Sequence, residues 1–156
     1  MEIYICYCCG YPIIFRVYGG SYHQPIHLPT GWPCWQMQQA GECDGKSHEL
    51  LQFPSTTSGA DRMERLKTSA GLYNAYLKTN KMKKILGFVK NHLRSGKSDV
   101  VRDLLEYIVD QGGPRGERDS LVNQIIVSDG WKTLHQRLVR QADRQEKQKA
   151  STKKKR

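Results

Sequence analysis

The residues most suited to metal binding or catalysis lie at the start of the chain. All five cysteines fall within the first 43 residues, and Cys6 and Cys9 are separated by two positions. This C-x2-C spacing lets two thiolates from one tight turn reach a common tetrahedral metal ion. Gly10 follows directly, and a glycine permits the positive φ angle that directs backbone N–H groups at sulfur. The segment therefore predicts a zinc knuckle.

A closed tetrahedral site needs two further ligands, and His27 and Cys34 are the leading candidates. Both lie in the proline-rich stretch 25–35, and the full spacing is C-x2-C-x17-H-x6-C. Because a rubredoxin-like iron site uses four thiolates, the histidine favours Zn2+. Three other residues compete for the fourth position: His23, Cys43 and Cys8. A second site that joins Cys8, Cys43 and His48 also stays open; otherwise Cys8 is a small side chain within the knuckle.

The number and setting of the cysteines favour a metal site over disulfides. Five is an odd count, which does not suit a closed disulfide framework. The first ten residues lack the basic start and the long apolar stretch of a secretory signal. No window approaches the roughly 18 apolar residues of a membrane helix. We therefore expect a soluble cytoplasmic protein with no membrane contact.

The segment from Cys6 to Cys34 resembles the short zinc ribbons of poorly characterised bacterial proteins. Their pattern is C-P-x-C-G, a strand that ends in Phe, a Gly pair, and a Trp-Pro-rich loop that ends in Cys. The matching residues here are Cys6, Cys9, Gly10, Phe15, Gly19, Gly20, Trp32, Pro33 and Cys34. The sequence departs from the pattern at Tyr7, where Pro is usual, and at the additional Cys8. The resemblance covers under a quarter of the chain and implies metal binding.

We expect β-strands before residue 60 and α-helices after it. The β-branched and aromatic run 13–18, which ends at a glycine pair, predicts a hairpin strand. Farther on, apolar residues recur every three or four positions, and Gly96 marks a helix end. This pattern predicts helices over about 61–78 and 82–93, from Ser98 or Asp99 to 108, from Asp119 to Ile126, and from Trp131 onward. The expected fold class is α+β: a small N-terminal zinc ribbon of β-hairpins, then a bundle of four or five short helices and a disordered basic tail.

Composition divides the chain into four segments. They are a zinc-ribbon module (1–48), a linker (49–60), a basic helical domain (61–140) and a basic tail (141–156). Pro54 and a Ser/Thr/Gly run mark the linker. The tail should begin as the end of a helix and then become disordered, because it has too few apolar residues to bury.

Positive charge is concentrated after the cysteine-rich part. The formal net charge is +10, yet residues 1–50 carry two basic residues against four acidic ones. Between Arg62 and Lys97 there are ten basic residues and one acid, Glu64. Such an excess is the usual footprint of contact with nucleic acid, DNA or RNA. The expected contact residues are Lys78, Lys81, Lys83, Lys84, Lys90, Arg94, Lys97, Lys153, Lys154, Lys155 and Arg156.

Residues 88–105 are similar to the two helices of ribbon-helix-helix repressors, whose joining turn often reads S-G-x-S-x-x-V-R. The matching residues are Ser95, Gly96, Ser98, Val101 and Arg102. The resemblance implies a strand at about 72–77 that pairs with its copy in a homodimer and enters the major groove. The helical period from Met63 to Leu77 instead predicts a plain helical hairpin.

No catalytic set emerges from the sequence. Paired carboxylates, G-x-S-x-G, a P-loop and H-E-x-x-H are absent. The chain is therefore expected not to be an enzyme. The leading hypothesis is a zinc-containing nucleic-acid-binding accessory or regulatory protein. The alternative is a zinc-stabilised protein–protein interaction adaptor with no direct nucleic-acid role, and either function allows a homodimer.

Overall fold

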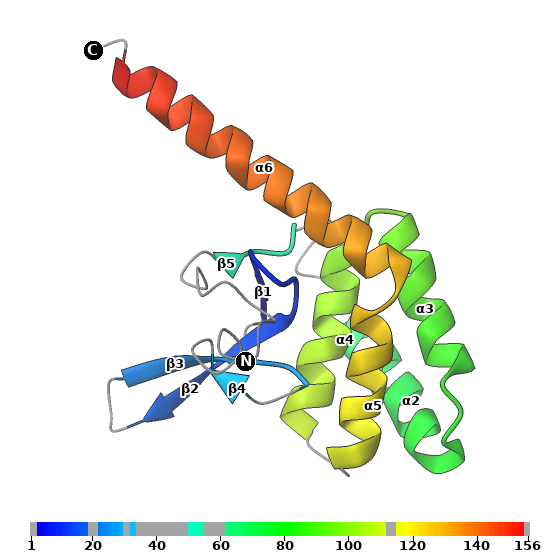
Figure 1. The fold of residues 1–156 in the computed structure, drawn as a ribbon. Coiled ribbons are helices and arrows are strands. Elements are labelled where there is room, and N and C mark those ends of the chain that lie inside the picture. Colours follow the sequence, from blue (N-terminus) through cyan, green and yellow to red (C-terminus); the bar gives the residue numbers. More distant parts are fainter. Residues whose placement is uncertain are drawn as a thin grey trace.

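The computed structural model describes residues 3–18, 22–29, 32–33, 50–54, 62–111 and 115–154. These residues form an α+β fold in which a five-stranded sheet precedes five helices (Figure 1), as the sequence predicted. The elements are β1 (Tyr4–Cys6), β2 (Pro12–Tyr18), β3 (Tyr22–His27), β4 (Trp32–Pro33), β5 (Leu50–Leu51), α2 (Arg62–Thr79), α3 (Lys83–Arg94), α4 (Ser98–Gln111), α5 (Arg115–Ile126) and α6 (Asp129–Lys154).

The sheet is antiparallel throughout, with strand order β4-β3-β2-β1-β5. Its centre is the β2–β3 pair, which runs from Ile13↔His27 to Tyr18↔Tyr22. The predicted strand 13–18 is confirmed in β2. Branched and aromatic side chains favour this extended conformation because they pack well on a pleated surface.

The two faces of the sheet have different neighbours, because successive side chains of a strand point to opposite faces. Ile5, Ile14 and Ile26 belong to the main hydrophobic core, together with buried residues of the helices. On the other face Ile13 packs against Cys6 in a separate small cluster. The sheet therefore rests on the helices with one face and carries the cysteine cluster on the other.

The helix boundaries follow the predicted pattern closely. Gly96 has a φ of 78° just after α3, and Asn80 has a φ of 57° just after α2, so each helix ends at a left-handed residue. Residues 72–77, where the second resemblance implies a strand, belong to α2. α5 begins at Arg115, earlier than the expected Asp119, and Glu117 in its first turn suits the positive end of a helix.

The last helix is longer than expected. A helix end followed by disorder was predicted for 141–156, whereas α6 continues to Lys154. Residues 140–154 contain neither Gly nor Pro and are mostly Arg, Gln, Lys, Glu and Ala, which favour helix. Figure 1 shows the C-terminal part of α6 extending beyond the other described elements.

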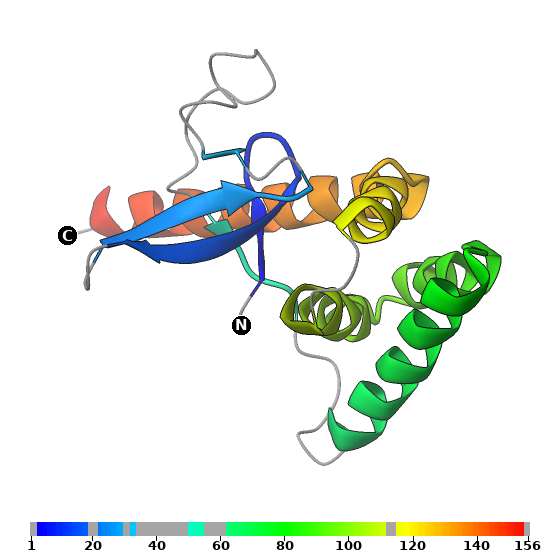
Figure 2. The ribbon, with the colours of Figure 1, turned by 90° about the horizontal axis from the view of Figure 1, so that it is seen from below.

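Sheet and helices share one hydrophobic core. Residues 49–60 were expected to be a linker, yet β5 pairs with β1, and both Leu51 and Phe53 are buried in this core. The ring of Phe53 lies 5.9 Å from that of Trp131 in α6. Figure 2 shows α4 between the sheet and α2. None of the described helices is both long enough and apolar enough to span a membrane.

Candidate metal centre

Three of the predicted ligands meet at the end of the β1–β2 turn. A ligand atom each from Cys6, Cys9 and His27 lies within 4.8 Å of the other two. In a tetrahedral zinc site, bond lengths place neighbouring ligand atoms about 3.5–3.8 Å apart. A small inward movement of these side chains would therefore suffice, and the group is close enough to hold a metal ion.

The centre is shielded from water. Cys6 and His27 are both 0% exposed, and Cys9 is half-buried. Ile13 packs against Cys6, and the ring of Tyr11 lies edge-on to His27 with the ring centroids 6.3 Å apart. A dry environment of this kind strengthens the attraction between thiolates and a cation.

The local backbone presents both thiolates on one tight turn. Gly10 N–H donates to Cys6 O (3.0 Å), and Cys6 N–H donates to Tyr11 O (2.9 Å). Gly10 adopts a φ of 77°, as the sequence predicted for the residue after the second cysteine. The glycine therefore lets the chain reverse directly after Cys9 and enter β2.

Hydrogen bonds hold Cys6 in the form that binds metals. The pKa of the Cys6 thiol is lowered from 9.0 to about 3, chiefly by the hydrogen bond that it accepts from the Cys9 side chain. Burial opposes this shift, whereas hydrogen bonds from His27 and from the backbone of Cys9 and Cys8 support it. Thiolates, not thiols, are metal ligands. The same atoms that share a proton around Cys6 can thus share a metal ion.

The strand register explains the position of His27. His27 pairs with Ile13, which lies on the same face as Cys6. His23 pairs with Val17, four residues away along β3, or about 13 Å at the rise of a strand. The competing histidine is therefore placed far along the same strand.

The other cysteines and the other histidine considered as ligands do not belong to this three-residue group. Cys8 is half-buried in the turn and does not belong to the three-residue group found among the described residues. The predicted ligand Cys34 and the alternatives Cys43 and His48 lie outside the described residues. Cys34 thus stays a prediction.

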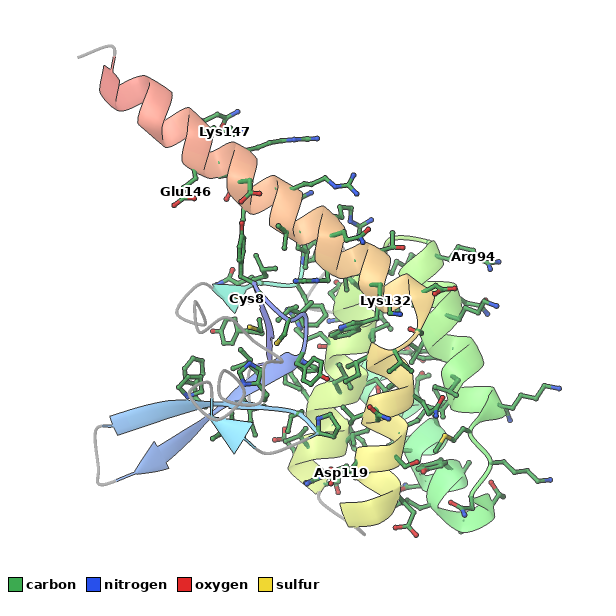
Figure 3. The ribbon with its side chains drawn as sticks, viewed as in Figure 1. Cys8, Arg94, Asp119, Lys132, Glu146 and Lys147 are labelled. Atoms are coloured by element: carbon green, nitrogen blue, oxygen red, sulfur yellow. The ribbon has the colours of Figure 1, made fainter. Side chains whose placement is uncertain are left out.

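Helix α6 contacts the turn through residues that were not predicted as part of the site. Trp131 Nε1–H donates to Gly10 O (2.7 Å), and His135 Nε2 lies 2.8 Å from Tyr7 O. Tyr7 also donates its hydroxyl hydrogen to a carboxylate oxygen of Asp143. Figure 3 shows this turn, marked by Cys8, beside α6. The only sequence signal was the helical spacing of 131 and 135, which does not identify a distant partner.

The contact between turn and helix leaves a small pocket beside the centre. Its volume is about 250 Å³, and it is lined by Cys9, Gly10, Tyr11, Ile126, Val127, Trp131, Lys132 and His135. Cys9 therefore borders a space that α5 and α6 enclose on the other side.

The predicted nucleic-acid residues lie away from the metal centre. Seven of them are exposed on α2, on α3 and in the connections that follow these helices: Lys78, Lys81, Lys83, Lys84, Lys90, Arg94 and Lys97. Lys153 and Lys154 belong to the end of α6, and Lys155 and Arg156 lie outside the described residues.

Comparisons with protein-family models, with curated proteins and with solved structures find no match to this chain.

Proposed function

We propose that the chain is a zinc-stabilised nucleic-acid-binding protein. In this proposal Cys6, Cys9 and His27 bind a structural Zn2+, and the exposed basic residues around α3 contact a phosphate backbone. The nucleic-acid part depends on one observation above all. The segment from Lys78 to Lys97 contains seven basic residues and no acidic residue.

The charges of this segment are not paired with acids in the part of the chain that the structure describes. All seven side chains are exposed, and none forms an ion pair with another residue that the structure describes. The nearest acids along the chain, Asp99 and Asp103, are buried in α4. Asp103 is bonded to Arg65, with 2.5 Å between Nε and Oδ2. The surface therefore keeps its positive potential, which favours a polyanion.

The outer face of α3 has a shape that suits close approach. Lys83, Gly87, Lys90 and Arg94 follow one another at intervals of four, three and four positions, so they lie on one side of the helix. A Cβ atom at Gly87 would meet nothing within 4 Å. Three cations around a residue without a side chain leave room for a phosphate group near the helix. Figure 3 shows Arg94 on the outer side of α3.

The donor set supports zinc as the metal. Two cysteine sulfurs and one imidazole are typical of structural zinc sites, which have four protein ligands. Cys34 is our proposed fourth ligand. The ion would fix the turn on which α6 packs, so its role would be to stabilise the fold.

Metal analysis with two matched serine variants tests the zinc site. We expect stoichiometric zinc in the native protein and in Cys8→Ser, because Cys8 lies outside the three-residue group. Cys6→Ser should lose the metal and unfold at lower denaturant concentration. Native protein purified without chelators that contains no zinc, or Cys6→Ser that binds it as tightly as Cys8→Ser, would contradict the proposal.

Fluorescence anisotropy with labelled duplex DNA, single-stranded DNA and RNA tests nucleic-acid binding. Removing three phosphate contacts with Lys83→Gln/Lys90→Gln/Arg94→Gln should reduce the slope of log K against log salt by about 2.7 for a duplex. The control is Lys67→Gln/Lys132→Gln, which removes two exposed lysines outside the segment, so the two losses are compared per charge removed. Equal binding by the two variants, or no binding of any nucleic acid by the native protein at low salt, would refute this function.

A further inference from the structure

The outer face of α6 carries a group of cations whose alignment on one side of a helix was not predicted from the sequence. Four exposed basic residues follow one another at intervals of three, four and three positions, which places them on one side of the helix. We call these residues the outer row: Arg137, Arg140, Arg144 and Lys147. At the rise of an α-helix the row is about 15 Å long.

The orientation of the outer row is set by contacts that other side chains of α6 make with the rest of the protein. Trp131, Leu134 and Leu138 are buried in the shared core. Farther along, Asp143 accepts the hydrogen bond from Tyr7 in the metal-binding turn. Because these contacts prevent rotation of the helix about its axis, the outer row faces solvent. Figure 3 shows Lys147 on a different side of α6 from Glu146.

No described acid forms an ion pair with the outer row. Like charges three or four positions apart destabilise a helix unless an opposite charge lies nearby. Asp143 has the right spacing to pair with Arg140 and Lys147, but it bonds to Tyr7 instead. None of the four basic residues forms an ion pair with another residue in the described part of the chain. The row thus presents four cations that are not held in any described ion pair.

We infer that the outer row is a second phosphate-binding surface, which contacts the backbone of the same nucleic acid as α3; this rests on the proposed function. Three of its four members are arginines, whose planar fork of donors matches a phosphate group. α3 and α6 pack tightly together, since a Cβ at Gly130 would lie 3.3 Å from the Leu93 side chain. The two basic surfaces therefore belong to one packed unit, and a bound nucleic acid would extend from one helix to the other.

The sequence of α6 offers a variant that removes the row without changing charge or composition. Each of the four basic residues has a glutamine beside it, and all four glutamines are exposed. Exchanging neighbours turns each cation about the helix axis by about 100°. The swap variant is Gln136→Arg/Arg137→Gln/Arg140→Gln/Gln141→Arg/Arg144→Gln/Gln145→Arg/Lys147→Gln/Gln148→Lys.

The experiment compares four proteins for binding to a labelled duplex of random sequence across a salt series. They are the native chain, the swap variant, a neutralised variant with all four row residues changed to Gln, and the α3 triple variant described above. Circular dichroism and zinc content check that the fold is intact. We expect the neutralised and the swap variants both to lose about 3–4 from the salt slope and about tenfold or more in affinity near 0.1 M salt.

The other possible results distinguish a failure of the inference from a failure of the proposed function. Native-like binding by the swap variant would overturn the inference, since net charge alone would then account for the effect of α6. If the α3 variant still lost binding, the proposed function would stand without the inference. If the native chain bound no nucleic acid, both would fail. Binding to phosphatidylserine vesicles that the swap variant loses, with nucleic-acid binding unchanged, would assign the row to an anionic membrane surface and also overturn the inference.

Discussion

Two glycines provide a matched test of the contact between the metal-binding turn and α6. Gly10 and Gly96 have almost the same positive φ angle, 77° and 78°. A Cβ at Gly10 would lie 2.9 Å from His135 Nδ1, whereas a Cβ at Gly96 would meet nothing within 4 Å. Alanine at either position therefore adds similar backbone strain, and only Gly10→Ala adds a clash with α6.

The size of the difference follows from these distances. A left-handed conformation costs a residue with a Cβ about 1–2 kcal/mol, and we expect Gly96→Ala to lower the free energy of unfolding by this amount. Gly10→Ala also forces the His135 ring to move, although its Nε2 lies 2.8 Å from Tyr7 O. Crowding a packed contact typically costs about 1–3 kcal/mol. We therefore expect a total loss of about 2–5 kcal/mol for Gly10→Ala.

Urea unfolding of the zinc-loaded proteins, followed by far-ultraviolet circular dichroism, measures both losses. Chelator competition should also show weaker zinc binding in Gly10→Ala, because the strained residue follows Cys9 directly. Gly96→Ala should bind zinc like the native chain. Equal destabilisation of the two variants, with the same zinc affinity in both, would show that the turn does not depend on its contact with α6.

Three further substitutions test other parts of the packing. Trp131→Phe removes the donor to Gly10 O and should cost about 1–3 kcal/mol in urea unfolding, because a buried acceptor is left without its bond. Asp103→Asn removes the carboxylate charge that pairs with the mostly buried Arg65 and should cost about 3–5 kcal/mol in the same assay. A loss below about 1 kcal/mol would contradict a buried pair. Burial raises the pKa of Glu106 above 4.5, so its ionisation weakens the fold as pH rises through the raised value. Glu106→Gln should therefore unfold at a higher temperature than the native chain at pH 7, and this advantage should disappear at pH 4. A difference in unfolding temperature that stays constant across pH would show that the ionisation of Glu106 is not responsible.

The local parts of this protein could be predicted from the sequence because their signals act within one turn of chain. The C-x2-C-G pattern specifies a turn with a left-handed glycine, and φ at Gly10 has the required sign. Apolar periodicity located α2 at about 61–78, against Arg62–Thr79 in the structure. The helix end near Gly96 was predictable for the same reason. Two ligands of the candidate centre, Cys6 and Cys9, come from this local information.

The rest depends on contacts between residues far apart in the chain. His27 reaches the thiolates because the β2–β3 register places it opposite Ile13, and register is decided by which faces are buried. Trp131 and His135 contact the turn across more than 120 positions, a distance at which helical periodicity contains no information about the partner. Phe53 lies in the core beside Trp131 of α6, a neighbour 78 positions away in the chain. The sequence by itself thus determined the turn, the strand at 13–18 and the approximate positions of the helices, whereas packing decided which of their side chains meet at the metal centre and which face of α6 is exposed.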